Sequence, residues 1–270
     1  SGHCVFFTDR MSSEEILQAV TNGNLALLNS LIESKTTPIL NVVNGSLETP
    51  LHLAAKCGHT AIVQLLVAAN ATLDANDRSS MTPLHRAAWE GHSQVVQLLV
   101  NAKADLDVMA QSNNTPVNLA ACRGHTSVVQ VLVNAKAALD IEDGLEFTPL
   151  THASWRGHSA TVQVLVDAKV DVNVHDRGFQ TPLHYAAMDG HSQVVRILVD
   201  AKADLNIRDR DGCSPLRRAA SYGHGEVVRI LAEAKANIDD DDMINFETSL
   251  HCAARRGYVE VIRALLSHFQ

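Results

Sequence analysis

Evenly spaced glycines are the feature that most constrains the fold of this 270-residue chain. Six of them, from Gly58 to Gly223, lie 33 residues apart, and Gly257 follows 34 residues after the last. A looser copy of the surrounding sequence lies around Gly23, 35 residues before Gly58. The chain is therefore a tandem repeat, and its fold has to be inferred from one repeat and its neighbours. The repeats predict one elongated domain without a linker.

The repeat that begins at Thr82 shows the expected secondary structure. A threonine hydroxyl can accept a hydrogen bond from a backbone N–H at a helix start, and Pro83 suits the first helical position. One leucine and two alanines in residues 84–88 form a narrow apolar face, and Gly91 can end this helix in the left-handed conformation. The following segment, residues 93–100, is apolar around most of its circumference. We expect a second helix there that neighbouring repeats cover on both sides.

The full repeats keep most of the motif Thr-Pro-Leu-His-x-Ala-Ala-x-x-Gly-His-x-x-Val-Val-x-x-Leu-Val, which is clearest from Thr181 onward. This motif resembles that of the ankyrin repeat, and the resemblance covers about 95% of the chain. It implies an all-α repeat solenoid of about eight helix–turn–helix units, including an N-terminal cap. It also implies that β-hairpin fingers project from the stack and that the first helices and finger tips line a concave groove.

The spacing of the repeats also predicts the domain and repeat boundaries. An N-terminal extension covers residues 1–11, and the ankyrin repeat domain covers residues 12–270. Within it, a cap of residues 12–43 precedes repeats that begin near 44, 77, 110, 143, 176, 209 and 242. The last predicted helix keeps apolar residues on its outer side, so we expect further repeats or domains beyond Gln270, or another surface that covers this end.

Two departures from the family pattern predict local weaknesses. The histidine that usually follows leucine, and that the resemblance implies joins neighbouring repeats, is replaced by Asn118, Thr151 and Arg217. We expect these three repeats to be looser. A lysine stands where the family usually has a left-handed glycine after the second helix, at Lys103, Lys136, Lys169, Lys202 and Lys235. Each costs about 1 kcal/mol of strain, offset in part by a charge effect of about 0.3–1 kcal/mol at a helix C-terminus.

Composition argues against several functional classes. A net charge of −8 disfavours a general nucleic-acid binder, and five scattered cysteines form no disulfide framework or Cys-x-x-Cys pair. No apolar run approaches the roughly 20 residues of a membrane span, and the start lacks the order of a secretory signal. We expect a cytoplasmic or nuclear protein. Ten of the 14 histidines recur at two repeat positions, and no catalytic or metal-binding motif occurs. We therefore expect no enzyme activity, no cofactor and no metal.

Helical geometry predicts where a partner binds. If the 84–88 face points to the core, then the positions of Arg86, Trp89 and Glu90 in each first helix point away from it. The twenty-one equivalent positions in seven repeats carry seven basic and two acidic residues. Aromatic residues collect there and at the finger tips, a composition typical of interface hot spots. The predicted contacts are Arg86, Trp89, Arg123, Leu145, Phe147, Trp155, Arg156, Tyr185, Met188, Arg218, Tyr222 and Arg255.

These observations favour a non-enzymatic interaction module whose groove binds a protein or peptide, as part of a larger scaffold or adaptor protein. The arginines favour a partner with carboxylates or phosphates near apolar anchors. The alternative is a groove for an anionic small ligand or single-stranded nucleic acid, which would use the same arginines and rings. Self-association through the apolar C-terminal end is a third possibility.

Overall fold

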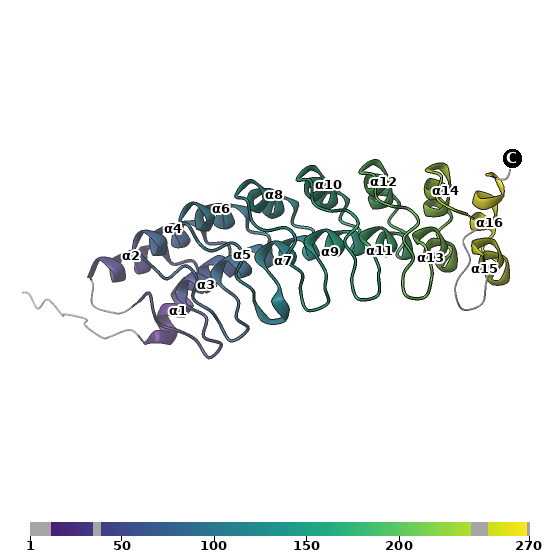
Figure 1. Ribbon diagram of the computed structural model, residues 1–270. Coiled ribbons are helices and arrows are strands. Elements are labelled where there is room, and N and C mark those ends of the chain that lie inside the picture. Colours follow the sequence, from purple (N-terminus) through teal and green to yellow (C-terminus); the bar gives the residue numbers. More distant parts are fainter. Residues whose placement is uncertain (1–11, 35–38, 239–247, 269–270) are drawn as a thin grey trace, which may run out of the picture. The chain divides into compact units, whose positions relative to one another are not determined.

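The computed structural model describes residues 12–34, 39–238 and 248–268. Its contacts divide the chain into two compact units, residues 1–111 and 112–270. Both are built from successive helix pairs (Figure 1), and the described residues contain no regular strand. The predicted all-α repeat solenoid is confirmed.

The first unit contains three helix pairs. Its first helices are α1 (Ser13–Thr21), α3 (Pro50–Lys56) and α5 (Pro83–Glu90), and its second helices are α2 (Leu25–Ser34), α4 (Thr60–Ala68) and α6 (Ser93–Asn101). Helix α3 packs against α1 and α5, and α4 packs against α2 and α6, so each kind of helix forms a row of its own. Ser12 and Glu15 form a capping box at the start of α1.

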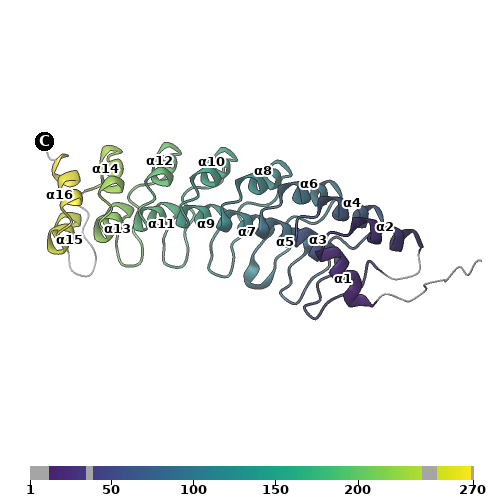
Figure 2. The ribbon, with the colours of Figure 1, turned by 180° about the vertical axis from the view of Figure 1, so that it is seen from behind.

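The second unit contains five helix pairs. Its first helices are α7 (Pro116–Arg123), α9 (Pro149–Trp155), α11 (Pro182–Met188), α13 (Pro215–Tyr222) and α15 (Ser249–Arg256). Its second helices are α8 (Thr126–Asn134), α10 (Ser159–Asp167), α12 (Ser192–Asp200), α14 (Gly225–Glu233) and α16 (Val259–Leu266). Within this unit, too, neighbouring first helices pack together and neighbouring second helices pack together, and the two rows are visible from both sides (Figures 1 and 2). A 3-10 turn, η1 (Gln111–Asn113), lies where the two units meet in the sequence.

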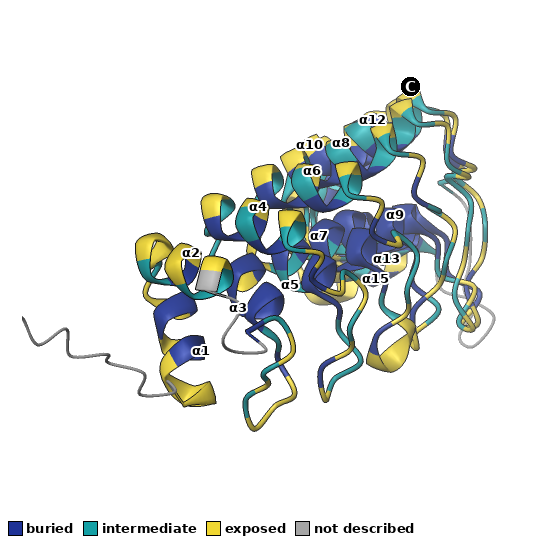
Figure 3. Cartoon of the chain, turned by 90° about the vertical axis from the view of Figure 1, so that its left-hand side faces the viewer, coloured by how far each residue is buried: buried dark blue, intermediate teal, exposed yellow. Residues whose placement is uncertain are grey.

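The helix ends form as the sequence predicts. Thr82 accepts a hydrogen bond from the backbone N–H of His85, Pro83 occupies the first turn, and Gly91 ends α5 with φ 84°. The leucine and two alanines of residues 84–88 are fully buried. Burial is densest along the row of first helices, whereas exposed residues gather on the second helices and on the fingers (Figure 3). The core therefore lies between the two rows of each unit.

Among the described residues, the fingers that begin at Asp77, Asp143, Asp176 and Asp209 are closed turns rather than regular β-hairpins. In the finger that precedes α5, Oδ1 of Asp77 accepts hydrogen bonds from the backbone N–H groups of Ser79 (2.7 Å) and Met81 (3.0 Å). The aspartates Asp143, Asp176 and Asp209 close their fingers in the same way. Single backbone hydrogen bonds link neighbouring fingers, such as the 2.9 Å bond from Arg210 to Gly178.

Within each unit, histidines join neighbouring repeats, which confirms their architectural role. His52 and His184 donate from Nε2 to the carbonyl oxygens of Met81 (2.9 Å) and Cys213 (3.1 Å) in the following repeat. The second set of histidines, just before the second helices, reaches back to the preceding repeat. His92, for example, lies 3.0 Å from the carbonyl oxygen of Lys56.

The prediction that the third repeat is looser is wrong for its first helix, α7. Asn118 is fully buried, and its amide Nδ2 donates to the carbonyl oxygens of Ile141 (3.2 Å) and Phe147 (3.4 Å) in the next repeat. Asparagine thus replaces histidine as the donor between repeats. Thr151 pairs its hydroxyl with Thr148 of its own repeat instead.

The five lysines after the second helices adopt the predicted left-handed conformation, with φ between 64° and 70°. Phe179, in a finger where glycine is usual, also has a positive φ of 56°. Its ring is half exposed and lies 5.1 Å from that of His175.

Candidate functional site

Each closed finger also holds a side chain of the helix that follows it. Oδ2 of Asp77 accepts hydrogen bonds from Nε (3.0 Å) and an Nη atom (2.5 Å) of Arg86, which also lies 3.3 Å from Glu48. Burial would raise the pKa of Asp77, but the backbone bonds to its carboxylate and the Arg86 guanidinium hold it below its usual range. Arg86 is therefore the cation of a largely buried ion pair.

The same arrangement recurs nine residues after three other finger aspartates. Asp209 binds Nε of Arg218 at 2.6 Å, and Asp211 adds a second carboxylate to this arginine. Tyr185 donates its hydroxyl to Asp176 at 2.5 Å. His152 donates from Nε2 to Asp143 at 2.8 Å. We call these four pairs the finger clamps.

The finger clamps correct part of the predicted partner surface. Arg86 and Arg218 are half-buried and bound to carboxylates, and Tyr185 is buried at 7% exposure. The prediction that the first of the three helix positions points to solvent is wrong, because the finger of the same repeat folds back along that side of the helix. The clamps could have been found in the sequence: where the finger residue is Ala110 instead of aspartate, the residue nine positions later is the apolar Leu119.

Three aromatic side chains from adjacent repeats form a cluster in the second unit. The ring of Phe147 lies 5.7 Å from that of Trp155 and 4.9 Å from that of Tyr185, both in edge-to-face geometry. Phe147 is only 6% exposed, so its predicted place at a solvent-facing finger tip is wrong. It comes immediately before the cap residue Thr148, where the chain has already returned to the core.

The other predicted residues remain accessible. Leu145 is 63% and Tyr222 52% exposed, and Arg123, Arg156 and Arg255 are exposed as well. Trp89, in the first unit, is half-buried, as are Trp155 and Met188 in the second. The guanidinium carbon of Arg156 lies 4.1 Å from the centre of a Trp155 ring, within the range of a cation–π interaction.

Four of these residues lie at the C-terminal ends of three neighbouring helices, α9, α11 and α13. We define the Trp155 surface as Trp155, Arg156, Met188 and Tyr222. Its backbone is fixed from the next repeats, because His191 lies 3.0 Å from the carbonyl oxygen of Trp155 and His224 lies 2.8 Å from that of Met188. The surface therefore presents large side chains on a rigid support.

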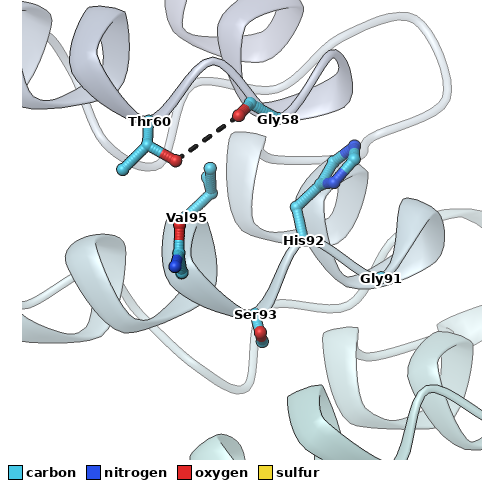
Figure 4. Close-up of a pocket in the computed structure, with 7 residues that line it drawn as sticks. Gly58, Thr60, Gly91, His92, Ser93 and Val95 are labelled. Carbon is cyan, nitrogen blue, oxygen red and sulfur yellow. Dashed lines mark hydrogen bonds between the residues drawn. The ribbon is translucent and has the colours of Figure 1, made fainter.

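A hollow of ≈ 230 Å³ in the first unit is separate from all the predicted residues (Figure 4). It is lined by Gly58, Thr60, Gly91, His92, Ser93, Gln94 and Val95. Two of its polar side chains have structural partners: the Thr60 hydroxyl donates to the carbonyl oxygen of Gly58, and Nε2 of His92 lies 3.0 Å from the carbonyl oxygen of Lys56. The hollow offers no charged group for the anionic ligand of the alternative hypothesis.

The described part of the chain contains neither a metal-binding cluster nor a membrane-spanning helix. No group of three or more histidine, cysteine, aspartate or glutamate side chains there is placed to hold a metal ion. No helix in residues 12–34, 39–238 or 248–268 combines the length and apolar character needed to cross a membrane.

Comparison with known proteins gives concordant matches. A family model described as "Ankyrin repeats (3 copies)" matches residues 16–111, 102–176 and 168–242, and another, "Ankyrin repeats (many copies)", matches residues 219–266. The mouse "Ankyrin repeat and SAM domain-containing protein 6" is 40% identical over 63 residues, which are 23% of this chain but only 7% of that protein.

Two solved structures resemble most of the chain. The ankyrin repeat domain of Bcl-3, titled a unique member of the IkappaB protein family, has a TM-score of 0.71 and 26% identity over 80% of this chain and 98% of its own. The human ASB11 ankyrin repeat domain has a TM-score of 0.73 and 25% identity over 82% of this chain and 98% of its own.

Proposed function

Because the chain belongs to the ankyrin-repeat family, whose domains are generally protein–protein interaction modules, we propose that its second unit binds a protein or peptide through the Trp155 surface. The observation that carries this proposal is the stacked pair of Arg156 and Trp155, which presents a cation over an aromatic face on a rigid helix row. Tryptophan, tyrosine and arginine are the side chains that most often dominate binding energy at interfaces.

The partner chemistry follows from the position of Arg156. Arg86 and Arg218 are bound by carboxylates of their own repeats, so they contribute little attraction for an anion. Arg156 is exposed and lies over the ring of Trp155. We propose a partner segment that places an apolar side chain against Trp155 and Met188 and a carboxylate or phosphate near Arg156. A scaffold or adaptor role in the cytoplasm is part of the same proposal.

The test is affinity capture with the double variant Arg156→Ala, Tyr222→Ala beside the unchanged chain. Both side chains are exposed, so their loss should leave the melting temperature nearly unchanged. We expect captured partner to fall by about tenfold or more, as for loss of interface hot spots. The matched control is Gln130→Ala, Gln163→Ala, which changes two exposed residues on the second-helix row and should retain capture.

Equal capture by the double variant and the unchanged chain would contradict the proposal. A steep salt dependence of binding to a generic single-stranded oligonucleotide would instead favour the nucleic-acid alternative.

A further inference from the structure

One finger clamp, formed by Asp143 and His152, also interacts with the thiol of Cys122. Asp143 and His152 are both buried, with side chains 5% and 7% exposed, and Nε2 of His152 is bound to Asp143. Within the described residues, Nδ1 of His152 is buried and makes no hydrogen bond that satisfies ordinary geometry. The edge of the imidazole that carries Nδ1 therefore faces away from Asp143, and Nδ1 has no hydrogen-bond partner in the part of the chain that the structure describes.

Cys122 lies at the end of α7, which packs beside α9, and the residues at the same two positions three repeats later, Ser221 and Cys252, lie 3.4 Å apart. The chain turn is fixed there by His158, whose Nε2 lies 3.1 Å from the carbonyl oxygen of Cys122. Interaction with His152 holds the pKa of the Cys122 thiol below its ordinary value against the effect of burial, and Arg156 acts in the same direction. Although burial disfavours the charged imidazole, Asp143 and Cys122 raise the pKa of His152 to about 9.

We propose that Cys122 is a thiol modification site that reacts with small anionic disulfides, activated by His152 and Asp143 and assisted by the exposed guanidinium of Arg156. A cysteine, a histidine and a carboxylate in this order supply a nucleophile, a cation that stabilises its thiolate, and a group that keeps this cation protonated. Cys122 is half-buried and so open to a small reagent. Partner binding is not required for this reaction, and the site stands independently of the proposed function.

The exchange needs no further oxidant. The Cys122 thiol loses its proton to solvent, and the thiolate is stabilised by the imidazolium of His152, which Asp143 helps to keep protonated. The thiolate sulfur then attacks one sulfur of the disulfide, forming a new S–S bond as the old one breaks. The other half leaves as a thiolate with the electron pair, which Arg156 attracts if it carries carboxylates.

The other described cysteines lack this environment. Burial raises the pKa of the half-buried Cys57 and of the buried Cys213. Cys252 is buried at 3% exposure. Cys57 is therefore the internal control, since its accessibility resembles that of Cys122 while its electrostatic environment is opposite.

The experiment measures the rate at which oxidised glutathione modifies each cysteine of the folded Cys4→Ser chain, followed by peptide mass spectrometry. At neutral pH we expect Cys122 to react about tenfold faster than Cys57, because one unit of thiol pKa changes the thiolate population tenfold. His152→Gln should slow Cys122 and move its pH–rate midpoint for iodoacetamide alkylation upward. Arg156→Gln should slow the glutathione reaction and leave the melting temperature unchanged.

Equal rates for Cys122 and Cys57 in the Cys4→Ser chain would overturn the proposal. So would an unshifted pH–rate midpoint in His152→Gln, provided that circular dichroism shows a folded variant. If that variant does not fold, the pH–rate midpoints of Cys122 and Cys57 for iodoacetamide alkylation are compared in the Cys4→Ser chain. A midpoint for Cys122 at or above that of Cys57 rejects the proposal.

Discussion

Asp143 and His152 lie nine residues apart and are joined by a 2.8 Å bond between two side chains that are both almost fully buried. The carboxylate closes a finger with one oxygen and binds an imidazole with the other. A buried pair of this kind is stable only while both members carry their charges, which makes the fold sensitive to pH at this point.

Stability should fall as the pH rises from about 6.5 to about 9. The pKa of His152 is raised in the folded chain to about 9, so the stabilisation that it provides is complete below the unfolded value and is lost as His152 deprotonates. The expected loss is on the order of 1–3 kcal/mol. Urea denaturation in a Cys122→Ser background, where the thiol neither titrates nor helps to raise the pKa of His152, should show the part of this loss that depends on Asp143, over a narrower pH range. His152→Gln should flatten the curve; an equal slope in that variant would reject the assignment.

A separate loss is expected on the acid side. Burial lowers the pKa of His52 and of His184, so both stay neutral in the fold while the unfolded chain takes up protons below about 6.5. Stability should therefore be complete above this value and fall as the pH decreases through it. Denaturation of His184→Gln should show a shallower acid slope than that of the unchanged chain. A slope that does not change would mean that His184 is protonated in the fold.

Removing the cation of a finger clamp should be costly. Arg86→Ala leaves Asp77 and Glu48 buried without their shared counterion, and we expect a loss of about 2–4 kcal/mol. Arg263→Ala removes one partner of the exposed Arg263–Glu260 ion pair and should change stability by less than about 1 kcal/mol. Chemical denaturation of both variants gives the comparison, and similar effects would show that Arg86 is not structural.

Asn118 should be nearly as important to its repeat as histidine is elsewhere. Asn118→Ala removes two hydrogen bonds to carbonyl oxygens of the next repeat and should cost about 1–3 kcal/mol. Asn118→His introduces the residue found at His85 and His184 and should retain most of the stability. A smaller loss in Asn118→Ala than in Asn118→His, measured by denaturation, would contradict the role inferred for the amide.

Local sequence rules predicted the parts of the fold that depend on a few neighbouring residues. Thr82, Pro83 and Gly91 start and end their helix as expected, because caps and left-handed turns are set by backbone groups within one turn. The lysines after the second helices were placed correctly for the same reason.

The candidate surface was harder to predict, because it depends on how each finger folds back onto its helix. A helical projection treats Arg86 and Tyr185 as solvent-facing, since it contains no finger. Phe147 was misplaced for a related reason: the residue before the cap threonine points inward, as the buried Glu48 and Cys213 at equivalent positions also show. The nine-residue spacing of aspartate and donor was present in the sequence and would have corrected the first error.

The histidines that reach back to the preceding repeat have a consequence for how such a chain acquires its structure. His92, His158, His191 and His224 each bond to a carbonyl 36 residues earlier, and His59 bonds 38 residues back across a finger that is two residues longer. The entropy lost in closing each loop is therefore almost the same at every step. Within each unit, no repeat has a privileged place to nucleate, and folding can spread from whichever pair of neighbours is locally most stable.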